Sequence, residues 1–183
     1  MKKTTSIVAL TCVCLLGFQN TFAQYYTKAN SKWFFGYQAG LDFSSGRPVN
    51  FVATNINSDE GAAGVCDLNG NTLFYTDGTS AYNRQGAVMQ NGNALTPFNT
   101  YGSCTQAAQI VQNIGNLNQY YVFSLQEDVH FVNPGDVDYG RLCYSMVDMT
   151  LDSGKGGVLA TEKAIMLDSV LSDRKSTRLN SSH

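Results

Sequence analysis

The chain has 183 residues, a formal net charge of −2 and only 14% charged residues. A nucleic-acid-binding domain shows a basic face, which this composition does not supply, so nucleic acid is excluded as a partner. The 17 glycines, 10 tyrosines and 10 phenylalanines are instead typical of an extracellular all-β chain with short strands and tight turns.

Residues 1–23 have the parts of a secretory signal peptide. Lys2 and Lys3 are basic, residues 7–18 are apolar, and the small residue Ala23 precedes the expected cleavage before Gln24. The apolar run is shorter than the roughly 20 residues that span a bilayer. We therefore expect a secreted or outer-surface chain with no membrane span after signal removal.

Residues 31–53 predict two or three strands with a turn at residues 44–48. Trp33, Phe34 and Phe35 stand together at the start of the first strand. Such a triplet forms either a ligand-stacking patch or a core anchor, and we expect at least one of the three rings to lie in the core.

Residues 64–89 predict four short antiparallel strands in succession. Asn69-Gly70 and Asp77-Gly78 are strong hairpin signals, because a type I′ turn needs positive φ at both central residues. The strands are expected at residues 64–66, 73–76, 80–82 and 87–89. A meander of four antiparallel strands is the unit of a propeller blade.

A second unit repeats the first. Strands are expected at residues 107–112 and 119–125, and the alanine pair at 62–63 recurs at 107–108, about 45 residues on, a period close to that of WD40 blades. A long loop is expected at residues 126–140, followed by a strand at 141–148, a glycine-rich turn at 152–157 and a strand at 164–167. Helical periodicity is absent.

The segment 173–183, DRKSTRLNSSH, is polar and basic. A natural basic tail is one interpretation, but the string resembles the translation of a common sequencing adapter, so we exclude it from the fold. Residues 24–172 then amount to about three blade equivalents, fewer than the roughly four of a closed propeller. We expect this truncated β-propeller, expressed alone, to expose unpaired strand edges and to aggregate or remain partly unfolded.

Five stretches carry a family resemblance: WFFGYQAGLDF, AAGVCDLNGNTLFYTDGTSAYN, SCTQAAQIV, NQYYVFS and LCYSMVDMTLDSGKGGV. They resemble the amino-terminal region of large secreted Bacteroidota proteins of the gliding-motility-associated or type IX secretion sorting-domain kind. The resemblance covers nearly all of residues 31–167. It implies a WD40-like propeller in a surface-exposed, adhesin-like protein, and Ser169 fits the short O-glycosylation pattern of that phylum.

Two groups of acidic residues offer metal or catalytic chemistry. Asp67, Asn69 and Asn71 alternate like calcium ligands, but Gly78 stands where an EF-hand needs glutamate, so a hairpin turn is favoured. Asp136 and Asp138 could form a glycosidase carboxylate pair or a calcium site, although exposed loop acids are more often only solvated. No metal site or cofactor is expected.

Nucleophilic catalysis would depend on His130, because the other histidine belongs to segment 173–183. The chain has no GxSxG nucleophile elbow, and a structural or solvent-facing histidine is favoured, so no catalytic residue is assigned. Cys66, Cys104 and Cys143 remain after signal removal. They allow either a Cys66–Cys104 disulfide or buried free thiols.

Three functions remain open. The favoured one is a non-enzymatic module that binds a protein or a glycan through its loops; the alternatives are a propeller hydrolase of glycans or peptides and a structural spacer. The expected contact residues are Phe98, Tyr101, Phe131, Asp136, Asp138 and Tyr139.

Overall fold

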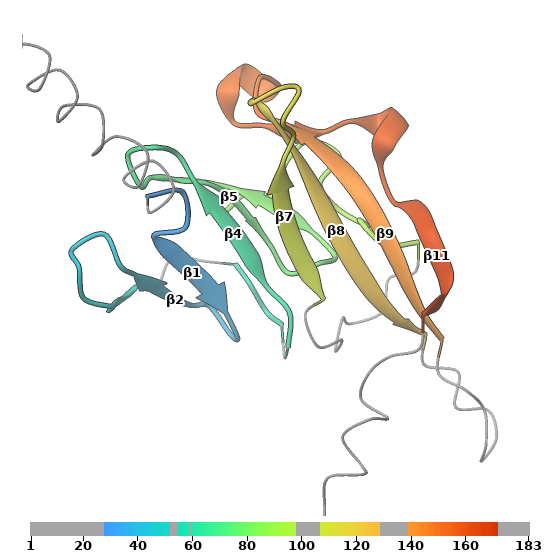
Figure 1. Ribbon diagram of the computed structural model, residues 1–183, viewed down its shortest axis with the longest axis horizontal. Helices are drawn as coiled ribbons and strands as arrows, with labels where there is room; N and C mark the ends of the chain where they lie inside the picture. The colour runs from blue at the N-terminus through green and yellow to red at the C-terminus, as the bar shows by residue number, and fades with distance from the viewer. Residues whose placement is uncertain (1–27, 52–54, 59, 98–106, 129–138, 172–183) are drawn as a thin grey trace, which may run out of the picture.

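The computed structural model describes residues 28–51, 55–58, 60–97, 107–128 and 139–171. These residues form three antiparallel sheets, two of three strands and one of five, which confirms the all-β prediction. They include no helix that is both long and apolar enough to cross a bilayer. The three sheets do not close into a ring within the described residues (Figure 1).

The first and second sheets are simple meanders. The first sheet has the order β1-β2-β3, which are Lys32–Phe35, Ala39–Asp42 and Val49–Phe51. The second sheet has the order β4-β5-β6, which are Ala63–Cys66, Thr72–Thr76 and Ala81–Asn83. Three strands of the predicted four-stranded meander are thus present.

The fourth predicted strand, residues 87–89, is present only as an isolated bridge. Val88 pairs antiparallel with Tyr82, and on either side of this pair Asn83 N–H donates to Ala87 O and Met89 N–H donates to Ala81 O, both at 2.9 Å. The chain then turns, with Gly92 N–H donating to Met89 O at 2.8 Å, and Met89 and Leu95 enter the core. Burial of these two side chains between sheets replaces a regular fourth strand.

The third sheet has the order β10-β9-β8-β7, with β11 also paired to β9. Its strands are β7 Ala108–Gln112, β8 Gln119–Asp128, β9 Tyr139–Asp148, β10 Gly157–Val158 and β11 Ile165–Leu171, with 3₁₀ turns η1 Asp152–Gly154 and η2 Ala160–Glu162. The predicted loop at 126–140 is too long, because β8 and β9 continue pairing out to Asp128 and Tyr139. Backbone pairing needs no apolar pattern, so the ladder extends beyond the residues that the pattern marks.

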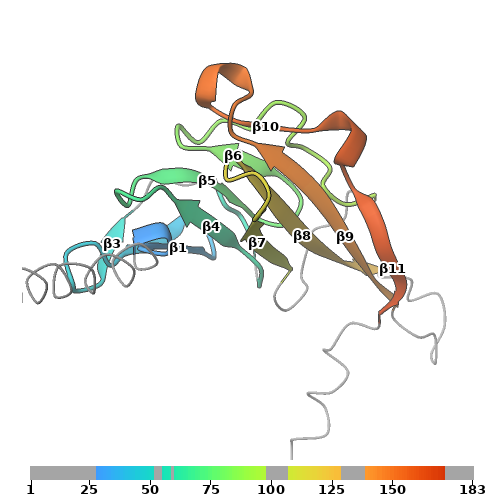
Figure 2. The same ribbon diagram turned by 45° about the horizontal axis from the view of Figure 1, so that its top comes forward.

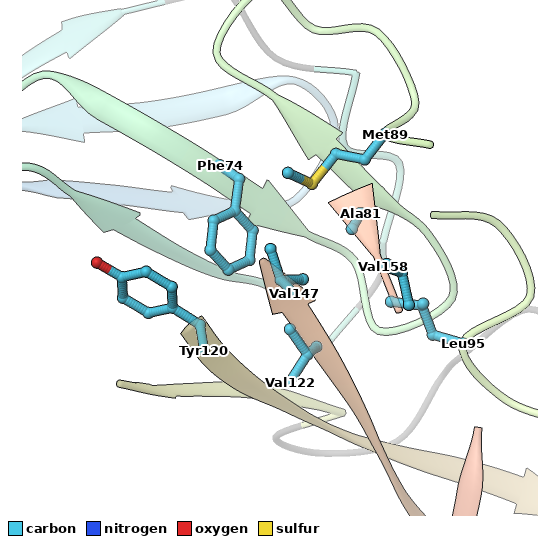
Figure 3. Packing of buried hydrophobic residues seen from close by; sticks show 8 residues of the cluster. All are labelled: Phe74, Ala81, Met89, Leu95, Tyr120, Val122, Val147 and Val158. Atoms are coloured by element: carbon cyan, nitrogen blue, oxygen red, sulfur yellow. The ribbon is translucent and has the colours of Figure 1, made fainter. Parts of the chain in front are cut away.

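The sheets lie side by side in chain order, the second between the first and the third (Figures 1 and 2). Strand β5 shows this most clearly, because both of its faces are buried. Phe74 packs in a cluster with Tyr120, Val122 and Val147 of the third sheet (Figure 3). Tyr75, the next residue, packs in a second cluster with Phe34 and Ile56 on the side of the first sheet.

Two glycines allow the sheets to approach closely. The ring of Phe34 occupies the space that a Cβ at Gly64 would need. Ala107, which precedes β7, occupies the corresponding space at Gly61, which precedes β4. Neighbouring sheets therefore meet where a side chain of one lies against bare backbone of the next.

Candidate functional site

Within the described residues, one edge strand of each of the three sheets borders the same groove. Strands β1, β4 and β7 are each an end strand of their sheet, and β4 lies against both of the others. A groove of about 570 Å³ opens along them. This edge groove is lined by Asn30, Lys32, Trp33, Phe34, Phe35, Ala62, Ala63, Gly64, Ala108, Gln109 and Ile110.

Strand β7 turns backbone hydrogen-bonding groups toward the groove. The Leu125 N–H donates to Ala107 O at 2.9 Å, so Ala107 stands at a hydrogen-bonded position opposite β8. Because bonded and non-bonded positions alternate along an antiparallel pair, Ala108 and Ile110 direct their N–H and C=O groups away from β8. Both residues line the edge groove.

Strand β1 has the same arrangement on the other side of the groove. The Phe43 N–H donates to Ser31 O at 2.7 Å, so the backbone groups of Lys32 and Phe34 point away from β2. Two sheet edges with outward-facing donors and acceptors thus border one space. An extended chain could pair with such an edge as an added strand.

The floor of the groove is made of small residues. Ala62, Ala63 and Ala108 carry only a methyl group, which leaves room for another backbone to come close, whereas the Phe34 ring already covers Gly64. These three alanines are members of the alanine pairs whose recurrence indicated a repeat in the sequence. That recurrence was the signal for the groove, although sequence reasoning interpreted it only as a blade period.

The positive charge of Lys32, which lines the groove, lies close to the Asp42 carboxylate of the same sheet. Lys32 Nζ lies 3.8 Å from Asp42 Oδ2 and 5.8 Å from the ring centroid of Phe51. Hydrogen bonds from Ser44 are the main cause of the lowered pKa of the Asp42 carboxyl, and Lys32 adds to it. Lys32 thus has its acidic neighbour in its own sheet.

The aromatic triplet divides between core and surface. Phe34 is buried and stacks on Tyr75 with 4.9 Å between ring centroids, which confirms the expected core anchor. Trp33 and Phe35 lie on the opposite face of β1 and are 57% and 42% exposed. Successive side chains of a strand point to opposite faces of the sheet, so Phe34 enters the core while its two neighbours face outward.

The residues predicted to make contacts are not brought together by the described part of the chain. Phe98, Tyr101, Phe131, Asp136 and Asp138 lie outside the described residues, as does His130. Tyr139 is the first residue of β9, and Ser169 lies in β11. The contact surface and the glycosylation site therefore stay predictions.

The cysteines give a partial answer to the disulfide question. Cys66 and Cys143 are buried free thiols, and burial raises the pKa of each thiol. Cys104 lies outside the described residues, so its pairing with Cys66 stays a prediction. Thiols that are buried and protonated at neutral pH are poor nucleophiles.

The Asp67 turn has the geometry of a hairpin. Asp67 Oδ1 accepts from the backbone N–H groups of Asn69 and Asn71 at 2.8 and 2.9 Å, and Oδ2 accepts from the Asn71 amide at 3.0 Å. Burial raises the pKa of this carboxyl, but these hydrogen bonds outweigh it and the net shift is downward. Among the described residues, no three His, Cys, Asp or Glu side chains gather as a metal site.

Comparisons with known proteins leave the family open. No family model matches the chain, and no match was found among curated proteins or among solved structures.

Proposed function

We propose that this chain is an exported, non-enzymatic binding module, built as part of a β-propeller, whose edge groove takes an extended segment of a partner protein. The observation that carries the proposal is the convergence of three sheet edges on one groove. Backbone pairing supplies affinity in such a mode, and small floor residues permit the approach.

The stacking of the sheets supports the propeller part of the proposal. Each of the first two sheets is an antiparallel meander that packs face to face on the next, and the first strand of each sheet lies beside the first strand of its neighbour. Propeller blades are arranged in this way around a central channel, with their first strands innermost. The edge groove then corresponds to a sector of that channel.

Export is proposed from residues 1–23, with secretion or display on the outer cell surface. Its test is the mature amino terminus, measured by mass spectrometry on protein from the medium and from the envelope. A chain that begins at Gln24 supports export, and an intact Met1 terminus confined to the cytoplasm opposes it.

Peptide binding is tested by selecting a phage-displayed library of random linear peptides against the chain that lacks residues 1–23. Selected peptides are then measured by isothermal titration against the variant Ala108→Pro. Proline removes the N–H that faces the groove but leaves the β7–β8 ladder intact, because proline is tolerated at outward positions of edge strands. We expect affinity to fall by about tenfold or more, since a backbone hydrogen bond is lost.

The matched control is Gln109→Pro, one residue along β7. Its N–H faces β8, so this variant should lower the melting temperature, whereas Ala108→Pro should not. Failure to select any peptide, or equal peptide affinity of the parent and Ala108→Pro chains, opposes the proposal. A glycan array is run in parallel, because the exposure of Trp33 and Phe35 favours a glycan as the second candidate ligand.

A further inference from the structure

The first sheet has an apolar face that is open to solvent, here named the front face. Trp33 and Phe35 of β1 project from it and are 57% and 42% exposed. Leu41 of β2 stands opposite Trp33 in the ladder, and the Phe43 ring centroid lies 4.9 Å from that of Trp33. The front face thus gathers aromatic and aliphatic groups that a soluble surface rarely exposes together.

The third sheet has a second apolar face at the other end of the stack, here named the back face, whose three rings are half-buried. Tyr121, Phe123 and Tyr144 form a row of rings, with centroids 6.2 Å and 5.9 Å from that of Tyr121. Val111 pairs with Tyr121, and Ile165 pairs with Tyr144, which puts both on the same face. Val111 is 44% exposed and Ile165 is 37% exposed.

The two interior interfaces show what such faces do when they are covered. Between the first and second sheets, Phe34 stacks on Tyr75 at 4.9 Å. Between the second and third sheets, Phe74 meets Tyr120 edge to face at 5.5 Å. In each interface, the earlier sheet contributes the face that corresponds to the back face, and the later sheet contributes the face that corresponds to the front face. The front and back faces are therefore the two ends of one continuing series.

The series also has the shape that closure needs. Between sheets, strand meets strand at β1 with β4 and at β4 with β7. Farther from these strands, Met89 and Leu95 of the segment after β6 fill the space between the second and third sheets. Sheets that touch at their first strands and are wedged apart beyond them fan out around an axis.

We propose that a second copy of this chain docks head to tail on these faces, the back face of each copy covering the front face of the other. The chain expressed alone then forms a closed pair, in place of the aggregation that the sequence alone predicts. Two copies bring six sheets together, within the roughly four to eight sheets of closed propellers. Head-to-tail contacts form a closed ring when their rotation completes a circle. In this ring the two edge grooves face a shared centre.

The first test is the mass of the chain that lacks residues 1–23, measured by sedimentation equilibrium at about 10 to 100 µM, a range that detects micromolar dimers. A mass of two chains is expected. A mass of one chain, or an open-ended series of larger species, overturns the closed pair.

The second test uses one charged substitution on each face. Trp33→Lys blocks the front face and Val111→Lys blocks the back face, and each variant alone should weaken dimerisation by about tenfold or more, because the lysine is buried without a partner. Ile114→Lys is the control: Ile114 is 96% exposed in the β7–β8 turn, lies on neither face, and its substitution should leave the dimer unchanged.

Mixing the two blocked variants decides the geometry. In the closed pair there are two back-to-front contacts, and each single variant places a lysine in both. A mixed pair of Trp33→Lys and Val111→Lys keeps one contact free of lysine, so an equimolar mixture should associate more tightly than either variant alone and less tightly than the parent chain. A mixture that associates no more than the single variants overturns the proposal, as does an unchanged dimer in both single variants. Peptide binding is measured separately on the Val111→Lys monomer. Because Val111 does not line the edge groove, this measurement distinguishes failure of the dimer proposal from failure of the proposed function.

Discussion

The ring of Phe34 lies over the backbone of Gly64, in the space that the Cβ of any other residue at position 64 would fill. This contact joins the first sheet to the second. The backbone of Gly64 has no positive φ, so the need for glycine there is one of space rather than of conformation.

The first prediction concerns Gly64→Ala. The added methyl group must displace the Phe34 ring or move β4, and overpacking of this kind costs about 1 to 3 kcal/mol. The free energy of unfolding from urea titration should fall by that amount. Gly115→Ala is the control, because the nearest atom to its Cβ would be Asn113 Oδ1 at 3.5 Å, an ordinary contact. Equal losses for the two alanine variants contradict the packing argument.

A second prediction concerns Tyr82. Burial, together with the nearby Asp77 carboxylate, raises the pKa of the Tyr82 hydroxyl to about 12, and this hydroxyl donates to Asp77 Oδ2 at 3.0 Å. A folded-state pKa above the unfolded value of 10 favours folding at lower pH. That contribution is lost as the pH rises from about 10 to about 12.

The measurement compares Tyr82→Phe with the parent chain by urea unfolding at several pH values. The variant should be less stable by about 1 kcal/mol at pH 8, because the hydrogen bond to Asp77 is lost. The difference should shrink above pH 10, since phenylalanine has no proton to lose. A difference that stays constant up to pH 12 would contradict the raised pKa of Tyr82.

A third prediction concerns Cys66 and Cys143. Both thiols are buried, and burial raises the pKa of each. We expect a few hours with a thiol reagent at pH 8 to leave both unlabelled in the folded chain, and denaturation to label both, as peptide mass spectrometry can show. If Cys66 is labelled only after denaturation and reduction together, it is in a disulfide, and the free-thiol state is wrong.

The fourth prediction concerns the turn at Asp67. Asp67→Ala removes the acceptor for two backbone N–H groups and one amide, and should cost about 1 to 3 kcal/mol. Asp67→Asn retains one carbonyl oxygen and should recover part of that loss. Millimolar calcium should leave the melting temperature of the parent chain unchanged. A rise that Asp67→Ala abolishes would show that the turn is a calcium site.

Local signals in the sequence predicted most strands. Asn69-Gly70 and Asp77-Gly78 each mark a turn of the second sheet, as predicted. Only the glycine of each pair has positive φ, so the expectation that both residues of a pair are the central residues of a type I′ turn is wrong. The ends of β8 and β9 could not be predicted in this way, since their length depends on a partner strand rather than on local pattern. The edge groove was missed for a similar reason: whether β1, β4 and β7 are edge strands depends on which strands pair in the fold.

The burial of β5 on both faces has a consequence for mutational tolerance. In most strands of small β proteins, every second position meets water and accepts many residue types. In β5, Phe74, Tyr75 and Thr76 are all buried in succession, so a saturation scan should find three adjacent intolerant sites. Strand β1 should show alternation instead, with Phe34 constrained and its two neighbours permissive to folding. The contrast would identify the central layer of the stack from growth or display data alone.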